Sequence, residues 1–326
     1  MPLVTSYEVL QAARDGGYAI GAFNANNLES VKAVIDACAE KEAPVILQVS
    51  QGAIKYAGLE EAAGIVKAAA AKVSIPVVLH LDHGTSYEQN VQCLRAGFTS
   101  LMYDGSKTPF DENVKVTEEI CRMSHACGIP VEAELGIIPK IEDYLTEEEM
   151  KPCREGDVEC VLDLMSEEQI AKLYEKSTKV EDAAAFVKAT GVDSMAVAIG
   201  AIHGMTGRGS RLDFDLLGRL SAEVGIPFVL HAASGIPFDQ MQKACQMGVC
   251  KVNVATRLSM VFIEGTKDYL DAHPSEKDFR KVFAPAMQNI KDAVFEYIDL
   301  FGCEGKAGTG WLCGPKGVKI TKESPE

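Results

Sequence analysis

The sequence predicts an α/β protein folded as a closed parallel (β/α)8 barrel, the TIM-barrel fold class. Short apolar runs, each the length of a buried strand, alternate with amphipathic helical stretches through most of the chain. The length of 326 residues is one that such barrels reach as a single domain. We therefore expect one domain over residues 1–326, with a long helical insertion after the fifth strand.

Eight runs are expected to form the strands of this barrel. They are rich in valine, isoleucine and leucine, as parallel strands buried on both faces require. Four of them begin at proline, whose missing N–H is tolerated at the first position of a strand. In chain order the runs are residues 18–24, 44–50, 76–82, 100–104, 130–135, 194–200, 227–233 and 249–255.

Helical stretches fill the intervals between these runs. Residues 28–41 and 112–128 place apolar side chains at helical spacing, and the second stretch ends at Gly128, a helix-stop signal. Two segments depart from the alternation: residues 137–180, which are long, charged and helical in pattern, and residues 271–326, which extend past the last strand. Residues 137–180 follow the fifth strand at the carboxyl rim of the barrel, where such barrels carry their active site, so we expect this segment to form a lid. The alternative is a surface excursion without a role.

The bulk composition sets limits on partners and compartment. The net charge of −15 argues against nucleic acid or an anionic membrane surface as a partner, although local N–H groups can still bind an anionic substrate. The 10 cysteines form no CxxC pair, the chain opens without a secretory signal, and no apolar run is long enough to span a membrane. We expect reduced thiols and a cytoplasmic protein.

Three of the 6 histidines stand at the ends of separate strand-like runs. His83 follows the run 76–82, His203 closes an apolar run that begins at Ser194, and His231 ends the run PFVLH. A single histidine at such a place is more often a hydrogen-bonded core residue. Three neutral imidazoles at one rim can instead bind a zinc-type ion and leave a coordination position open for substrate.

Other polar residues are expected at the same rim, because the active site of such a barrel lies at the carboxyl ends of its strands. An acid–base carboxylate beside three metal ligands suits either a hydrolase or a lyase. The polar and small residues near the strand ends are Asn24, Ser50, Asp82, Asp104, Glu132, Glu134, Gly200, Ser234, Asn253 and Thr256.

Five short motifs, each near a strand end, carry a family resemblance. They are LHLDHG at 79–84, EAELG at 132–136, AVAIG followed by HG within 196–204, LHAASGIP at 230–237 and KVNVAT at 251–256. In this order they resemble the motif set of class II, zinc-dependent ketose-bisphosphate aldolases. The wording NVAT is more similar to the tagatose-bisphosphate branch than to the branch with aspartate after the asparagine. The resemblance covers residues 1–310 apart from the insertion.

The resemblance implies a zinc centre with an acid–base group beside it. His83, His203 and His231 would hold the zinc, which polarises the ketone of the dihydroxyacetone phosphate half and stabilises its enediolate. Asp82 would exchange the proton of the C4 hydroxyl. The alternative for Asp82 is to orient an imidazole, which is the role that we favour for His80.

Three more acidic residues are assigned through the resemblance. Glu134 and Asp104 match carboxylates that take zinc in an alternative position, and a structural hydrogen bond at the rim is the other explanation. Glu142 aligns with a mobile-loop glutamate that moves the C3 proton, but Pro139 and Lys140 replace the usual double glycine ahead of it. Since that replacement stiffens the hinge, a solvated surface acid is the alternative for Glu142.

We expect a substrate pocket that binds an anionic group at each end, of which the resemblance implies the C1-phosphate end. Arg208 stands beside the position of a family lysine and would bind the C1 phosphate bidentately, or else be a solvated loop charge. Arg257 and Lys140 would bind a distal anion, a phosphate or a sulfonate, or else be plain surface charges. The further substrate-binding residues are Asn24, Ser50, Gly204, Ala233, Ser234, Asn253 and Thr256, preceded in one loop by Ala232 where the family has glycine.

These expectations converge on a zinc-dependent aldehyde-lyase. It would reversibly cleave a ketose (bis)phosphate, fructose 1,6-bisphosphate or tagatose 1,6-bisphosphate, into dihydroxyacetone phosphate and an aldehyde. Another ketose 1-phosphate, sulfonated or deoxy, is the alternative substrate, and a metal-dependent hydrolase or a non-catalytic sugar-phosphate-binding barrel are the rival functions. We further expect a monovalent cation, Na+ or K+, near the phosphate site, a homodimer or homotetramer, and neither nucleic acid nor membrane as a partner.

Overall fold

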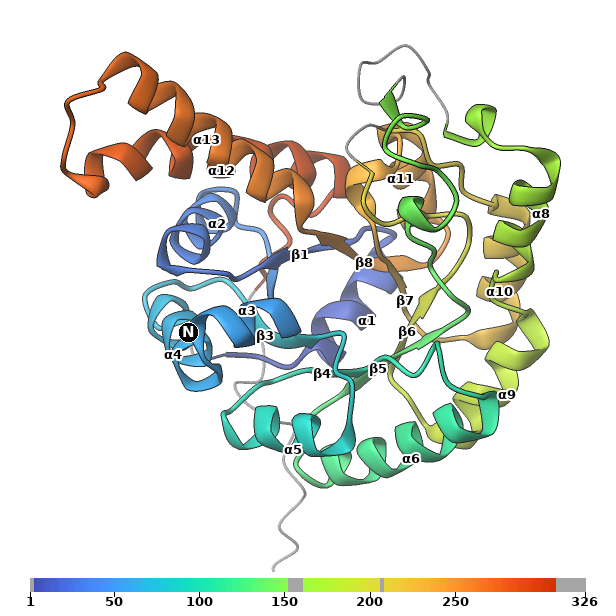
Figure 1. The fold of residues 1–326 in the computed structure, drawn as a ribbon. Coiled ribbons are helices and arrows are strands. Elements are labelled where there is room, and N and C mark those ends of the chain that lie inside the picture. The colour runs from blue at the N-terminus through green and yellow to red at the C-terminus, as the bar shows by residue number, and fades with distance from the viewer. Residues whose placement is uncertain (1–2, 152–160, 206–207, 309–326) are drawn as a thin grey trace, which may run out of the picture.

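The computed structural model describes residues 3–151, 161–205 and 208–308. Eight parallel strands form one sheet in the order β3-β2-β1-β8-β7-β6-β5-β4. The two outermost strands of this order also meet, because the Leu81 N–H donates to the Ser100 carbonyl at 3.0 Å and His80 pairs with Ser100. The sheet therefore closes into the predicted (β/α)8 barrel, with the strands at the centre and helices around them (Figure 1).

Each of the eight strands lies within a run that the sequence predicts. Their side chains are buried almost throughout, as expected for parallel strands covered by helices. The strands are β1 (Ile20–Asn24), β2 (Val45–Ser50), β3 (Val77–Asp82), β4 (Leu101–Tyr103), β5 (Val131–Leu135), β6 (Ser194–Val197), β7 (Phe228–Leu230) and β8 (Val249–Val254).

Two strands end earlier than predicted, for a backbone reason. β6 stops before the chain turns at Gly200, where φ is 102° and a Cβ would lie 2.1 Å from the Arg211 carbonyl oxygen. His203 therefore lies in a loop and not at the end of a strand. β7 ends at Leu230 because Ala232 has a left-handed φ of 59°, which an extended strand cannot adopt.

Capped amphipathic segments form the helices around the barrel. The Asn27 side chain accepts the Ser30 N–H at 2.9 Å and starts α2, and Gly225 in the left-handed conformation ends α10. The helices that follow β1 to β7 are α2 (Leu28–Glu40), α3 (Gln51–Ala57), α4 (Leu59–Ala70), α5 (Tyr87–Arg95), α6 (Phe110–Ala126), α8 (Glu167–Glu175), α9 (Val180–Thr190), α10 (Phe214–Val224) and α11 (Phe238–Gln246).

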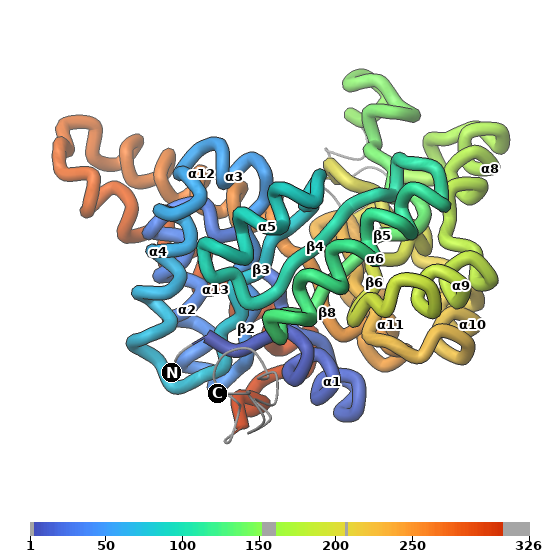
Figure 2. Tube along the Cα trace, turned by 90° about the horizontal axis from the view of Figure 1, so that it is seen from below, coloured from blue at the N-terminus to red at the C-terminus, as the bar shows by residue number. Residues whose placement is uncertain are grey.

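Three further helices lie outside this simple repeat. α1 (Ser6–Gly16) packs at the amino ends of the strands, since the Val4 N–H just before it donates to the Val77 carbonyl. α12 (Thr256–Ala272) follows β8, and α13 (Phe279–Phe301) packs back along it and along α2. The α12–α13 pair projects from one side of the barrel in both views (Figures 1 and 2). The rest of the predicted extension, residues 309–326, lies outside the described residues.

The predicted insertion, residues 137–180, is only partly helical. Where it is described, it contains two short 3-10 turns, Ile141–Asp143 and Val161–Leu164, besides α8 and the start of α9. Residues 152–160 lie outside the described part. The insertion has a small apolar cluster of its own, which includes two residues of the β6–α10 loop: Ile141, Leu145, Met150, Val161, Leu162, Met165 and Leu173 with Ile202 and Met205. Among the described helices, none is long and apolar enough to cross a membrane.

Candidate metal centre and active site

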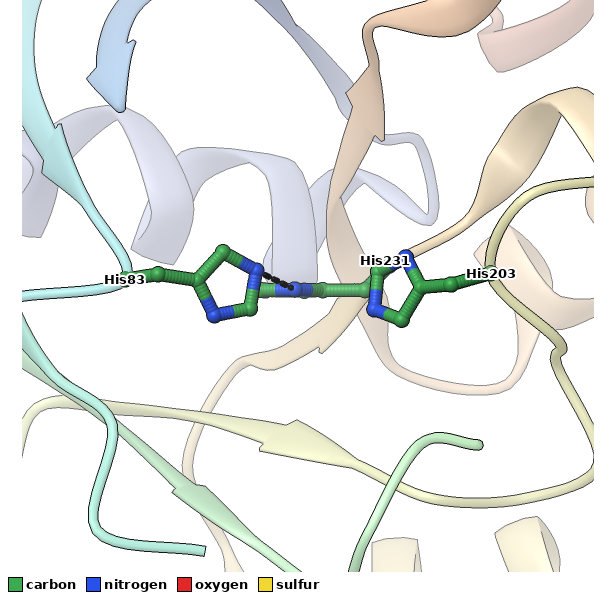
Figure 3. Close-up of side chains that lie close together, drawn as sticks. All are labelled: His83, His203 and His231. Carbon is green, nitrogen blue, oxygen red and sulfur yellow. Dashed lines mark hydrogen bonds between the residues drawn. The ribbon is translucent and has the colours of Figure 1, made fainter. Parts of the chain in front are cut away.

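Three imidazole rings converge at the carboxyl rim of the barrel (Figure 3). His83 follows β3, His203 lies in the β6–α10 loop and His231 follows β7. One ring nitrogen of each lies within 4.8 Å of the others, and His231 Nδ1 is 3.1 Å from His83 Nε2. Three nitrogens around one point suit zinc, which takes three protein ligands in catalytic sites and keeps a fourth position open.

The backbone at His83 is held in a strained conformation. Its φ of 51° lies in the left-handed region, which non-glycine residues rarely occupy. A Cβ on the next residue, Gly84, would lie 2.2 Å from the Met102 carbonyl oxygen, so the chain must pass this point without a side chain. Such strain persists where the surrounding structure imposes it, and here it follows the end of β3 directly at the metal-ligand position.

Two carboxylates form a second group of potential ligands with His83. Asp104 Oδ2 is 2.9 Å from His83 Nδ1, and Glu134 Oε2 is 3.7 Å from the same nitrogen. Glu134 Oε2 is buried without a hydrogen-bond partner, which fits an oxygen that faces a cation. The structure thus brings Asp104 and Glu134 to the place where the resemblance implies an alternative zinc position.

Burial and neighbouring charge shift the pKa values of these groups in opposite directions. Burial and the negative charge of Asp104 raise the pKa of Glu134 to about 8. Burial works against the protonation of His83, but the hydrogen bond to Asp104 and nearby carboxylates outweigh it and raise its pKa to about 9. Burial and the charge of His83 lower the pKa of His203 to about 4. The carboxylates therefore favour positive charge on His83, whereas burial and neighbouring like charge disfavour negative charge on Glu134 and positive charge on His203.

Asp82 lies beside the histidines without belonging to either group of potential ligands. Its Oδ1 accepts a hydrogen bond from Asn253 Nδ2 at 3.2 Å and is 4.0 Å from His83 Nε2. The side chain is buried, and burial raises the pKa of its carboxyl. A buried carboxylate with a raised pKa, held by one hydrogen bond at the edge of a cavity, is suited to exchange protons.

A cavity lies beside these groups at the carboxyl rim. The loops after β7 and β8 line it with small residues and backbone N–H groups, which suit a phosphate. The structure thereby brings together most of the residues expected at the C1-phosphate end. The lining comprises Gln48, Asp82, His83, Ile202, His203, Gly204, Met205, His231, Ala232, Ala233, Ser234, Gly235, Asn253, Ala255 and Thr256.

Five predicted substrate-binding residues do not line this cavity: Asn24, Ser50, Lys140, Arg208 and Arg257. Asn24 accepts a hydrogen bond from Gln48 Nε2 at 2.7 Å, and Ser50 Oγ accepts the Ala53 N–H that begins α3. The Arg208 guanidinium stacks on the Phe238 ring at 3.2 Å from its centre. Arg257 reaches the phosphate loop through its backbone, because its N–H donates to Ser234 Oγ at 3.3 Å.

The first residues of the insertion are attached to the loop of His203. The His203 N–H donates to the Pro139 carbonyl at 2.8 Å, and the Ile141 N–H donates back to the His203 carbonyl at 3.1 Å. Lys140, which is exposed, lies between these bonds. A Cβ at Gly204 would lie 3.0 Å from Glu142 Oε1, so the exposed Glu142 side chain lies next to Gly204, which lines the cavity.

The sequence-based prediction of the site did not include two residues that lie in or directly beneath it. Gln48 lines the cavity, and Lys251 lies inside the barrel with only 1% of its surface exposed. The signal for Lys251 was available, because a lysine within the apolar run of a central strand is buried and needs a partner. Its partner, Glu132, is 119 positions away in the sequence, and only the fold shows the pairing.

Fold and site together define a barrel enzyme with a candidate metal centre and a polar cavity at its carboxyl rim. Residues 4–306 match the family model described as fructose-bisphosphate aldolase class-II, and the chain belongs to this family. It is a class II aldolase, a lyase of a family that depends on zinc in general. The expected resemblance, fold and aldolase activity are thus confirmed, and the rival hydrolase and non-catalytic functions are set aside.

Similar proteins agree with this assignment. The chain is 39% identical over 322 residues to a fructose-bisphosphate aldolase of Streptococcus pneumoniae serotype 4, covering 94% of this chain and 100% of that one. A fructose-bisphosphate aldolase of Streptococcus pyogenes serotype M1 is 38% identical over 330 residues, with coverage of 94% and 100%. Among solved structures, the YdjI aldolase of Escherichia coli K12 superposes with a TM-score of 0.76 at 31% identity, covering 94% of this chain and 100% of that chain.

Proposed function

We propose that the chain reversibly cleaves fructose 1,6-bisphosphate into dihydroxyacetone phosphate and an aldehyde, with zinc held by His83, His203 and His231. The convergence of three histidine nitrogens within 4.8 Å at the cavity floor carries this proposal. Relatives that are named fructose-bisphosphate aldolases at 38–39% identity favour the fructose substrate over the tagatose one. Zinc, when bound, would polarise the substrate carbonyl as a Lewis acid.

Two carboxylates near the proposed metal position transfer protons, one at the C4 hydroxyl and one at C3. Asp82, which lines the cavity, takes the proton of the C4 hydroxyl as the C3–C4 bond breaks, and Asn253 holds its Oδ1 by a hydrogen bond. Glu142, whose carboxylate lies beside Gly204, exchanges the C3 proton. Asp104 and Glu134 would offer a metal ion a second set of ligands together with His83.

Each end of the substrate has its own set of contacts. Backbone N–H groups around Gly204, Ala233 and Ser234 bind the C1 phosphate, with Thr256 and a monovalent cation beside them. Arg257 contacts the same loop through its backbone N–H, and we assign the positive charges of Arg208 and Arg257 to the stabilisation of the C1 phosphate.

Asn24 and Ser50 lie at the rim where the neighbouring strands β1 and β2 end, next to β8. We assign them, together with Lys140, to the distal phosphate. The enzyme would act in the cytoplasm as a homodimer or homotetramer.

A retro-aldol assay tests the function directly. Purified protein is assayed against fructose 1,6-bisphosphate, tagatose 1,6-bisphosphate, fructose 1-phosphate and a sulfonated ketose 1-phosphate, before and after zinc removal by a chelator. We expect the highest kcat/KM with fructose 1,6-bisphosphate, loss of activity without metal, and recovery with zinc. Full activity in metal-free protein, or the absence of fructose 1,6-bisphosphate cleavage with zinc bound, would contradict the proposal.

A further inference from the structure

A layer of charged and polar side chains lies inside the barrel, directly beneath the residues of the site. His80 on β3, Glu132 on β5 and Lys251 on β8 are exposed by only 1%, 2% and 1%, respectively. Each precedes a residue of the site by two positions, and side chains two positions apart lie on the same face of a strand. This buried layer therefore supports Asp82, Glu134 and Asn253 from below.

Lys251 is the centre of this layer. Its Nζ lies 2.8 and 3.1 Å from the two oxygens of Glu132 and 3.1 Å from His80 Nε2. His80 Nδ1 in turn contacts Ser100 Oγ at 2.7 Å, where β4 begins. All three hydrogens of the ammonium group thus find acceptors, a condition that a fully buried charge requires.

The Glu132 carboxylate connects this layer to the metal centre. Its Oε1 lies 3.3 Å from Nε2 of His231, a side chain with 0% exposure. The other nitrogen of that ring, Nδ1, faces His83 Nε2 at 3.1 Å. A carboxylate that accepts the Nε2–H leaves the Nδ1 lone pair free for a metal and fixes the plane of the ring.

We propose that Glu132 and Lys251 are positioning residues for His231, which hold its ring with Nδ1 toward the metal and so set the affinity for zinc. The inference rests on the proposed metal role of His231. Lys251 acts through Glu132: it binds both carboxylate oxygens and thereby prevents the carboxylate from turning away from the imidazole. Neither residue touches the substrate cavity.

Substitution of Glu132 by glutamine tests whether its hydrogen bonds position His231, because glutamine has nearly the same volume as glutamate. Both oxygens of Glu132 lie within 3.1 Å of Lys251 Nζ, so the amide NH2 of glutamine meets the ammonium group in either orientation. The glutamine must turn and release His231. We expect Glu132→Gln to weaken zinc binding by about 10–100-fold, the effect that is typical of a lost partner of a metal ligand. Lys251→Met, which frees the carboxylate, should weaken it over the same range.

The double variant Lys251→Met/Glu132→Gln gives the decisive comparison. Without the ammonium group the glutamine oxygen is free to accept the His231 Nε2–H again. We expect this variant to bind zinc more tightly than either single variant, so that the two losses are not additive. It also removes both buried charges together, which protects it from the unfolding that one unpaired charge can cause.

Zinc affinity is measured by competition with a chelator, and the visible absorption of the Co2+-loaded protein reports ligand geometry. Thermal unfolding of metal-free protein reports stability separately. Thr190→Val is the matched control, because it removes a buried hydroxyl at the end of α9, away from the barrel interior. It should lower stability without changing zinc affinity or the Co2+ spectrum.

Single variants that lose stability but keep the parent's zinc affinity would overturn the inference, and so would strictly additive losses in the double variant. If His231→Ala keeps the parent's zinc affinity, the proposed metal site itself is wrong and the inference falls with it. A weakened site in His231→Ala together with unchanged affinity in Glu132→Gln and Lys251→Met refutes the positioning role alone.

Discussion

Replacement of Asp82 by asparagine should separate carbon–carbon cleavage from metal binding. The asparagine keeps the shape of the side chain, and its oxygen can still accept the hydrogen bond from Asn253. Asp82 Oδ1 is 4.0 Å from the nearest nitrogen of His83, and the carboxylate belongs to neither group of potential metal ligands among the described residues. We therefore expect Asp82→Asn to retain zinc.

The expected loss in cleavage follows from the role of a positioned acid–base group. Such a group contributes about 10²–10⁴-fold to the rate, which corresponds to about 3–5 kcal/mol of transition-state stabilisation. Burial of Asp82 favours the upper part of this range, because a carboxyl whose pKa is raised by burial is a stronger base. The loss should fall on kcat, since the substrate carbonyl and phosphates keep their contacts.

Two reactions measured on the same variants test this reasoning. Cleavage is followed by a coupled assay, and exchange of the C3 proton of dihydroxyacetone phosphate with deuterated water is followed by NMR. Exchange needs no C4 hydroxyl, so Asp82→Asn should preserve it better than cleavage. Glu142→Gln should impair exchange as well as cleavage. An equal loss of both reactions in Asp82→Asn, or a loss of zinc, would refute the assigned role.

Four further predictions concern the metal, the insertion and pH. Alanine at any one of the three proposed histidine ligands should leave a folded protein without bound zinc, and full zinc content by mass spectrometry would remove that residue from the ligand set. Lys140→Ala should raise KM by about one order of magnitude for a substrate with a distal phosphate but not for one that lacks it, since a charge-assisted hydrogen bond contributes about 1.5–3 kcal/mol. An equal response to both substrates would show that Lys140 does not bind the distal phosphate. Replacing residues 145–175 by a short linker should weaken zinc binding and raise KM, because this segment supplies most of the apolar cluster that holds the His203 loop, and unchanged kinetics would argue for surface decoration. The Asp193 carboxylate, 2.7 Å from His125, raises the pKa of that histidine above 6.5. The pair therefore stabilises the fold fully below pH 6.5 and progressively less as pH rises through the raised pKa. His125→Gln should remove this pH dependence from the melting temperature, and an unaltered profile would show that the pair does not contribute to stability.

The periodicity of the sequence was sufficient to predict the barrel. Apolar runs spaced by helices leave few folds open, because a parallel strand needs a helical crossover and burial on both faces. The same argument predicted where the site lies. In a parallel barrel all carboxyl ends of the strands meet at one rim, so His83 and His231 were expected together at that rim. His203 also reaches this rim, but through the loop after Gly200 and not at the end of a strand, as its apolar run had predicted.

Tertiary structure decided what depends on contacts between distant segments. The sequence marked residues 137–180 as an insertion, but only the fold shows that it binds the His203 loop through Pro139 and Ile141. It also shows Ala232 in a left-handed turn, which no local pattern required.

By itself the sequence determined the barrel, its rim and the types of side chain gathered there, because strand periodicity and chain direction are local properties that fix which residues face inward and at which end. Only the tertiary structure decided that Lys251 pairs with Glu132 and that Glu132 faces His231. These contacts join β8, β5 and the end of β7 across the barrel interior. They follow from strand register and barrel closure, which are set by the packing of the whole molecule and not by any one segment.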